Sequence, residues 1–218
     1  MNIYCISGLG ADWRVFQYLK LEHHRLIHLP WIAPNKNEPI KDYAERLMND
    51  IDQSKPYSLL GMSFGGMVSI EIVKQIAVKP KVLFLVSSLA VSAELPYIIR
   101  VSRKMNLPRI LPTKLWLWPN PISAYFFGTK TKTSRSLLGQ ILQDTDPTFL
   151  RWALKAIVDW QNTDDIEAVR IHGSDDKILP LSSNTNAYVI PDEGHFMVVN
   201  KADKVSEILL EALKAFPL

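Results

Sequence analysis

A serine lies at the centre of a glycine-rich segment, Gly61-Met62-Ser63-Phe64-Gly65-Gly66, that is suited to expose a nucleophile. The segment follows the apolar run Tyr57-Ser58-Leu59-Leu60 and precedes a helical pattern that starts near Val68, so it predicts a strand, a sharp turn and a helix. Glycine two residues before and two after the serine leaves room where the chain crosses itself, because a Cβ atom there would clash. The free N–H groups of a helix N-terminus lie behind the hydroxyl. This is the sequence pattern of a nucleophile elbow.

The same pattern also fits a glycine-rich turn that relieves crowding, or a loop that binds phosphate, so the partners of Ser63 decide between these interpretations. A serine hydroxyl becomes a nucleophile when a base takes its proton and a third group orients that base. With an elbow, the order along the chain is serine, carboxylate, histidine. Here His172-Gly173-Ser174-Asp175-Asp176 and Asp192-Glu193-Gly194-His195-Phe196 follow two predicted strands in that order. Because carboxyl ends of parallel strands meet at one sheet edge, we expect both loops to approach Ser63.

His195 is the predicted base among the five histidines of the chain. It alone lies in a glycine-flanked loop at the expected edge, and the alternative is a structural histidine that caps the region of the last helix. His172 ends a strand and is expected to brace the following turn through backbone hydrogen bonds. The remaining histidines occupy a polar connector or the interior of a strand: His23, His24 and His28.

Asp176 is the predicted acid that orients the base. In the spacing His-Gly-x-x-Asp the carboxylate lies one short turn beyond the strand, whereas Asp175 is expected to point elsewhere or to cap the turn. Asp192 and Glu193 are too close to His195 in sequence to reach its far nitrogen easily. Asp175 remains the alternative acid.

Two backbone N–H groups are expected to stabilise the oxyanion that such a nucleophile forms. Phe64 follows the serine and supplies one N–H from the helix N-terminus. Leu9, in the loop Ser7–Asp12 after the first predicted strand, supplies the second. That loop also resembles half of a dinucleotide-binding motif, but Trp13 stands where the third glycine is needed, so a dinucleotide site is disfavoured.

These loops need a scaffold of alternating strands and helices. Short apolar runs predict strands at Ile3–Ser7, Arg25–Leu29, Tyr57–Gly61, Lys81–Ser87, Val169–His172 and Ala187–Ile190. Helical patterns cover Asp12–Leu19, Ile40–Ile51, Gly66–Ile76 and Lys201–Phe216. The alternation favours an α/β fold with a parallel sheet that is covered on both faces.

Residues 89–160 interrupt the alternation, and we expect this insertion to be helical and to lie over one edge of the sheet. Helical patterns cover Tyr97–Met105, Ser134–Gln143 and Pro147–Trp160. Between Leu95 and Gln143 there is no Asp or Glu, and the cations are Arg100, Arg103, Lys104, Arg109, Lys114, Lys130, Lys132 and Arg135. The aromatic residues of the insertion include Tyr97, Trp116, Trp118, Tyr125, Phe126 and Phe127.

The aromatic side chains of the insertion are interpreted as its own small core, with the lining of an acyl or aromatic pocket as the alternative. Its cations are interpreted as a solvated face, with the attraction of anionic substrates or of a membrane surface as alternatives. We expect no nucleic acid partner, because the basic stretch has no recognisable binding module and the rest of the chain is acidic overall.

The composition, 47% hydrophobic and 22% charged over 218 residues, predicts one globular domain that spans residues 1–218. The single cysteine, Cys5, lies in an apolar run and is predicted to be a buried hydrophobe in a reducing compartment. No basic leader with an apolar core is seen, and no apolar stretch approaches 18 residues. We therefore expect a cytoplasmic protein without stable membrane association, and the oligomeric state is not predicted.

Together, the elbow, the His172-Gly173-Ser174-Asp175-Asp176 segment with Ile178-Leu179-Pro180 after it, and Gly194-His195-Phe196 resemble the serine α/β-hydrolase superfamily. The resemblance covers nearly the whole chain. It implies a three-layer fold of about six mostly parallel strands, with helices on both faces and residues 89–160 as an inserted helical cap. It also implies Ser63 as nucleophile, His195 as base, Asp176 as its partner, and Leu9 and Phe64 as oxyanion donors.

The chain departs from the family pattern in two places. It starts directly on the strand before the oxyanion loop, without the usual antiparallel hairpin, and Ser7 stands where the family often has histidine, which puts the rigidity of that loop in question.

The resemblance implies a serine hydrolase that cleaves a small carboxylic ester or thioester through an acyl-enzyme. Acyl transfer, C–C hydrolysis and peptide cleavage are alternatives on the same residues, and a non-catalytic ligand-binding protein is the alternative from another class. The expected partner is a small ester-type molecule. No cluster of ligands predicts a metal, and no complete nucleotide motif predicts an organic cofactor.

Overall fold

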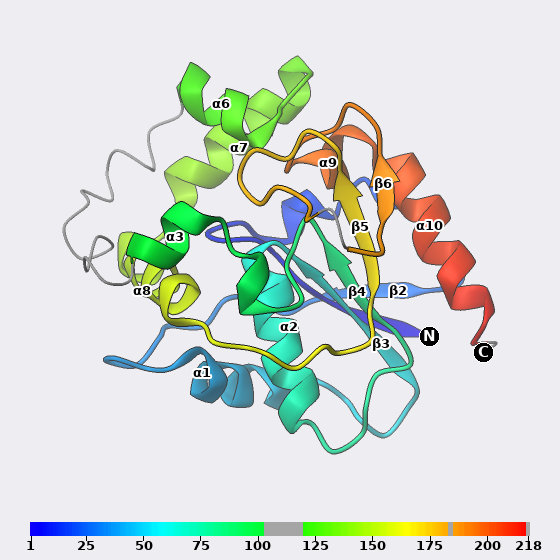
Figure 1. The fold of residues 1–218 in the computed structure, drawn as a ribbon. Coiled ribbons are helices and arrows are strands. Elements are labelled where there is room, and N and C mark those ends of the chain that lie inside the picture. Colours follow the sequence, from blue (N-terminus) through cyan, green and yellow to red (C-terminus); the bar gives the residue numbers. More distant parts are fainter. Residues whose placement is uncertain (103–119, 183–184, 217–218) are drawn as a thin grey trace.

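A six-stranded parallel sheet forms the centre of the molecule (Figure 1). The computed structural model describes residues 1–102, 120–182 and 185–216. The strands are β1 (Asn2–Ile6), β2 (Arg25–His28), β3 (Tyr57–Met62), β4 (Leu83–Val86), β5 (Val169–Gly173) and β6 (Tyr188–Ile190). They lie in the order β2-β1-β3-β4-β5-β6, and every neighbouring pair is parallel. The predicted α/β fold with about six strands is confirmed.

The strand order places the predicted loops side by side. The chain leaves β1 toward β2 at one edge and then returns to β3 on the other side of β1, so β1 and β3 are neighbours. The loops after these two strands contain the expected oxyanion donor and the elbow. In an open parallel sheet, ligands bind at the carboxyl ends of the strands where the order reverses.

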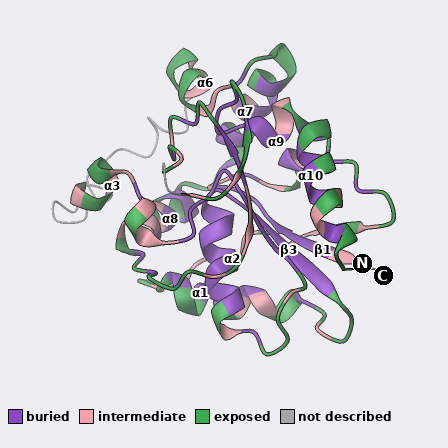
Figure 2. Ribbon diagram, turned by 45° about the vertical axis from the view of Figure 1, so that its right-hand side comes forward, coloured by how far each residue is buried: buried purple, intermediate pink, exposed green. Residues whose placement is uncertain are grey.

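Apolar cores cover both faces of the sheet, and alternate side chains of β1, β2, β3 and β4 belong to different cores. In β1, Tyr4 and Ile6 join one apolar cluster, whereas Ile3 and Cys5 join the other. Helices α1 (Ile40–Leu47), α2 (Phe64–Gln75) and α8 (Pro147–Asp159) cover the first face, and α7 (Lys132–Asp144), α9 (Met197–Asn200) and α10 (Ala202–Lys214) cover the second. Figure 2 shows the resulting buried centre, with β1, β3 and α2 coloured as buried.

The predicted helix Asp12–Leu19 is wrong, because the structure has only a 3-10 turn there, η1 (Trp13–Val15). The Asp12 side chain accepts a hydrogen bond from the Arg14 N–H, and it also binds the Arg14 guanidinium. The chain leaves the helical path after Phe16, whose side chain packs into the core with Val15. Local capping and tertiary packing therefore replace the regular helix that the apolar pattern suggested.

The insertion contains η3 (Ser92–Glu94), α3 (Tyr97–Ser102) and α6 (Pro121–Phe127), followed by α7 and α8. Helix α6 was not predicted. Pro121 is instead the first helical residue, after Asn120 in a capping box with Ser123. The rest of the predicted helix Tyr97–Met105 lies outside the described residues, and the boundaries of the cap stay a prediction.

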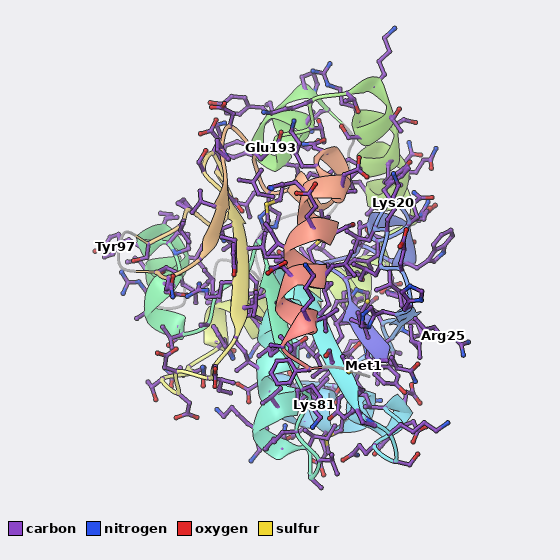
Figure 3. The ribbon with its side chains drawn as sticks, turned by 90° about the vertical axis from the view of Figure 1, so that its right-hand side faces the viewer. Met1, Lys20, Arg25, Lys81, Tyr97 and Glu193 are labelled. Carbon is purple, nitrogen blue, oxygen red and sulfur yellow. The ribbon has the colours of Figure 1, made fainter. Side chains whose placement is uncertain are left out.

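The interpretation of the cap aromatics as a small core is wrong for three of them. Tyr97, Tyr125 and Phe126 are exposed, with 75%, 62% and 46% of their surface accessible, and Figure 3 shows Tyr97 at the outer edge of the molecule. Trp116 and Trp118 lie outside the described residues. Of the described members of this set, Phe127 turns inward, where it packs against Phe196.

Cys5 is buried, as predicted, and burial raises the pKa of its thiol well above the ordinary range. Across the described residues, no helix is long and apolar enough to cross a membrane. The same residues contain no group of three or more His, Cys, Asp and Glu side chains that is placed to bind a metal ion.

Candidate active site

Ser63 occupies a strained turn between the end of β3 and the start of α2. Its backbone has φ 52° and ψ −122°, a conformation that L-residues rarely adopt. A Cβ atom on Gly61 would lie 2.5 Å from the Gly66 Cα, and one on Gly65 would overlap the carbonyl oxygen of Ile6. The two glycines are therefore required by close backbone approach, as the sequence pattern predicts.

Neighbouring strands hold this turn in place. The Ser63 N–H donates to the Val86 carbonyl at 2.9 Å, and the Ser88 hydroxyl donates to the Ser63 carbonyl at 2.6 Å. Because both bonds come from the end of β4, the position of the serine is fixed by the sheet rather than by a mobile loop.

The three predicted side chains form one chain of hydrogen bonds. His195 Nε2 lies 2.8 Å from Ser63 Oγ, and His195 Nδ1 lies 2.8 Å from Asp176 Oδ2. The carboxylate only accepts, so Nδ1 carries the proton and Nε2 is left to accept from the hydroxyl. All three residues are buried, with Ser63 at 8% exposure the most accessible. The geometry thus brings together a hydroxyl, an imidazole in the required tautomer and an orienting carboxylate.

Asp176 is held by its own loop, residues 174–180 (the acid loop). Its Oδ1 accepts hydrogen bonds from the N–H groups of Ile178 and Leu179, both at 2.9 Å. His172 Nε2 lies 2.7 Å from the Leu179 carbonyl oxygen, which confirms its predicted role as a brace for the turn. The same nitrogen lies 3.3 Å from Asp176 Oδ2, a contact that the sequence reasoning missed.

These contacts decide the ionisation of Asp176. Burial on its own raises the pKa of a carboxyl group, but here the electrostatic interaction with His195 opposes that effect. Hydrogen bonds from His195 and from the Leu179 amide, together with the nearby His172 ring, add to the opposition. The pKa of Asp176 consequently lies well below its ordinary value, and the group is a carboxylate throughout the physiological range.

Asp175, the alternative acid, is exposed and lies elsewhere. Its N–H donates to the Glu193 carbonyl at 2.8 Å, and its carboxylate accepts a long hydrogen bond of 3.4 Å from Ser174. The carboxylate of Asp175 therefore belongs to the surface of the turn, while that of Asp176 contacts His195.

The loop after β1 lies against the serine. A Cβ atom on Gly8 would stand 3.4 Å from the Ser63 Cβ. The loop is closed by the Ala11 N–H, which donates to the Gly8 carbonyl at 2.9 Å, and by the Ser7 hydroxyl, which donates to the Ala11 carbonyl at 2.6 Å. Ser7 thus ties the loop at the position where the family often has histidine. Leu9 lies within this closed loop, one residue beyond the glycine that faces Ser63.

Phe64 is the first residue of α2, where backbone N–H groups have no partner within the helix. Within the described part of the chain, the N–H groups of Leu9 and Phe64 donate no hydrogen bond. Both N–H groups therefore have no partner among the described residues.

The loop that carries His195, residues 191–196 (the histidine loop), is held by a distant segment that sequence reasoning missed. The ring of Phe127, at the end of α6, lies 5.8 Å from the His195 ring in an edge-on arrangement. The Phe127 carbonyl accepts a hydrogen bond from the Phe196 N–H at 2.9 Å. More than 60 residues separate the two segments, so no local pattern signals the contact.

A cavity of about 590 Å³ lies between α6, α7 and the ends of the acid and histidine loops. Its lining includes three cations, Lys130, Arg135 and Lys177, and two carboxylates, Asp175 and Asp192. Neither Ser63 nor His195 belongs to the lining. This cavity therefore lies beside the hydrogen-bonded residues and does not include them.

Comparison with known proteins finds likeness in structure but not in sequence. No protein-family model and no curated protein matches the chain. An esterase from Exiguobacterium antarcticum is similar over 98% of this chain and 92% of its own, with a TM-score of 0.73 and 17% identity. A thermophilic esterase from Thermogutta terrifontis is similar over 99% and 90%, with a TM-score of 0.73 and 17% identity.

A meta-cleavage product hydrolase from Pseudomonas fluorescens IP01 is similar over 100% of this chain and 92% of its own, with a TM-score of 0.70 and 14% identity. These likenesses span nearly the full length of each protein. Taken with the six-stranded parallel sheet and the strained turn at Ser63, they show that the chain has the α/β-hydrolase fold.

Proposed function

We propose that the chain is a serine hydrolase that cleaves a small carboxylic ester or thioester through an acyl-enzyme. The observation that carries the proposal is the continuous set of hydrogen bonds from Ser63 through His195 to Asp176, built on a strained turn. Esterases among the structural neighbours support this class of reaction.

In the proposed reaction, His195 Nε2 accepts the proton of Ser63 as Oγ attacks the carbonyl carbon of the ester. The C–O bond to the alcohol breaks as His195 returns that proton to the leaving group. Water then attacks the acyl-enzyme, again giving a proton to His195, and the acid is released with the serine restored. Asp176 stays ionised throughout and stabilises the imidazolium that forms in each step.

The N–H groups of Leu9 and Phe64 are the proposed oxyanion donors. Both flank Ser63, one in the loop against it and one at the helix N-terminus, where the helix dipole adds positive potential. Stabilisation of a tetrahedral oxyanion by two such donors needs neither a metal ion nor an organic cofactor, and we propose that none takes part.

Acyl transfer, C–C hydrolysis and peptide cleavage use the same three side chains and remain alternatives. A panel of esters and thioesters of varied acyl length, with and without acyl acceptors, separates these reactions by their products. A ligand that binds tightly and is recovered unchanged would instead support a non-catalytic binding protein. The proposed location is the cytoplasm, which the lone, buried Cys5 supports.

The direct test is covalent labelling with a fluorophosphonate probe. The folded protein is expected to be labelled at Ser63, and Ser63→Ala is expected to abolish both labelling and ester turnover without loss of fold. Ser136→Ala, on the exposed face of α7, is the matched control and should behave as the parent protein. A folded parent protein that resists the probe and turns over no ester would overturn the proposal.

A further inference from the structure

We infer that residues 127–130, the end of α6 and the turn after it (the α6–α7 turn), position the proposed base His195, and that Lys130 is the positioning residue that acts through Glu193. The inference rests on the proposed function, because it assigns a role to residues that support His195. It also assigns a structural role to Lys130, a cation of the insertion that takes no part in the proposed reaction.

Glu193 is a buried carboxylate two residues before His195. Its side chain is 1% exposed, and Figure 3 shows it beneath the helices of the insertion. A carboxylate in such a place is stable only when a positive charge or several hydrogen bonds compensate for the lost water. Its partners therefore control the position of the histidine loop.

Lys130 supplies the positive charge. Its Nζ lies 3.2 Å from Glu193 Oε1 and also donates a hydrogen bond to the Asp192 carbonyl. Asn200, at the end of α9, completes the arrangement, because its Nδ2 donates to Glu193 Oε2 at 3.1 Å and to the Gly128 carbonyl at 2.8 Å. One ammonium group and one amide thus join the α6–α7 turn to the histidine loop.

The backbones of the two segments are also in direct contact. A Cβ atom on Gly194 would stand 2.9 Å from the Gly128 Cα, so the segments approach as closely as glycine permits. The Phe127 carbonyl accepts from the Phe196 N–H, and the Phe127 ring packs edge-on to His195. A displacement of the turn would therefore move the imidazole.

In this proposal Lys130 acts on the histidine loop, where its ammonium group contacts Glu193 and the Asp192 carbonyl, while its side chain stays 46% exposed at the cavity. Removal of the ammonium group leaves Glu193, buried two residues from the base, with the Asn200 amide as its remaining partner among the described residues. The histidine loop must then shift to bring Glu193 to water, and His195 loses its alignment with Ser63. A shift of about 1 Å in a reacting group is enough to lower a rate on the order of 100-fold.

The test compares Lys130→Met with Lys132→Met, a matched control at an exposed position in α7. The readouts are the rate of fluorophosphonate labelling and the kcat and KM for a neutral p-nitrophenyl ester and a carboxylate-bearing analogue. Lys130→Met is expected to lower kcat and the labelling rate about 10- to 100-fold with little change in KM, while Lys132→Met leaves both unchanged. Lys130→Arg should restore most of the activity.

A second variant tests the inference even if Lys130→Met folds poorly. Lys130→Met/Glu193→Gln removes both charges and is expected to fold and to recover much of kcat. Equal activity in Lys130→Met and the parent overturns the inference, and so does a rise in KM for the carboxylate-bearing ester alone. A parent protein that the probe does not label overturns the proposed function and the role of Lys130 together, so the two failures are distinguishable.

Discussion

The acid loop and the histidine loop meet at one set of hydrogen bonds, but they are supported in opposite ways. Asp176 is held by groups within four residues of it in sequence, namely His172 and the N–H groups of Ile178 and Leu179. The histidine loop is held mainly across the fold, by residues of the α6–α7 turn. One half of the site is therefore built locally, while the other half depends on how the insertion packs.

This difference assigns two tasks to the insertion. Its exposed aromatic residues Tyr97, Tyr125 and Phe126 contribute little to the buried cores, whereas Phe127 and Gly128 lie against the histidine loop. Helices α7 and α8 also pack into the two main cores of the sheet. The insertion is thus part of the scaffold of the site, in addition to any cover that it provides.

The largest expected effect comes from Asp176→Asn, which breaks the local half of the site. The amide favours the wrong tautomer of His195 and leaves its charged form unsupported, so kcat should fall about 10³- to 10⁴-fold. Asp175→Asn, one residue earlier and exposed, should change kcat less than about twofold, a range typical of surface positions. Steady-state kinetics on one p-nitrophenyl ester measures both variants, and a reversed ranking would mean that the acid is misassigned.

The next effect comes from Gly194→Ala, which breaks the long-range half. The new methyl group would stand 2.9 Å from the Gly128 Cα, so one of the two backbones must move. We expect a loss of about 1–3 kcal/mol in the free energy of unfolding, as for other overpacked sites. We also expect a fall in kcat on the order of 100-fold, because His195 is the next residue.

Urea unfolding and ester kinetics measure the two quantities on the same preparation. Gly128→Ala places a methyl group on the other side of the same contact, 2.8 Å from the Gly194 Cα, and should reproduce the loss of kcat. Full activity in both variants would show that the histidine loop does not depend on the insertion.

The locally supported half of the site could be predicted from the sequence, whereas the contacts that support the other half across the fold could not. The strand–turn–helix at Ser63 and the spacing from His172 to Asp176 are local, so glycine positions and residue order predicted them. The bonds between Lys130 and Glu193, and between Phe127 and Phe196, join segments more than 60 residues apart. Nothing in the pattern of either segment signals the other, and α6, whose last residue lies at this contact, was not predicted.

The η1 turn illustrates a second limit of sequence reasoning. The apolar spacing from Asp12 to Leu19 suits a helix, yet the Asp12 side chain binds the Arg14 N–H and guanidinium and keeps the segment to a single turn. Whether a side chain binds nearby backbone N–H groups depends on local geometry, and the spacing of apolar residues does not reveal it.

The smallest expected effect comes from His172→Leu, which weakens the local support without removing the acid. Loss of the hydrogen bond to the Leu179 carbonyl and of the 3.3 Å contact with Asp176 costs about 1–3 kcal/mol of folding free energy, and kcat should fall about 10-fold or less. His172→Gln retains a donor near Asp176 and should lose less of both. Unfolding by urea at neutral pH, with kinetics on the same samples, checks this ranking.

The pH dependence of the loss of unfolding free energy in His172→Leu shows whether His172 stabilises the ionised form of Asp176 or acts only through packing. The pKa of Asp176 is lower in the folded protein than its unfolded value of about 3.9, so its ionisation stabilises the fold fully above that value. This stabilisation disappears as the pH falls through the pKa of Asp176 in the folded protein, because the carboxyl is then protonated in both the folded and the unfolded state.

The variant His172→Leu makes the pKa of Asp176 in the folded protein less depressed. The difference in unfolding free energy between parent and variant should therefore be widest at neutral pH and should narrow below about pH 4. A gap that stays constant from pH 7 to pH 3 would instead mean that His172 acts through packing and the Leu179 carbonyl alone, and the local support of the acid would then rest on the two backbone amides.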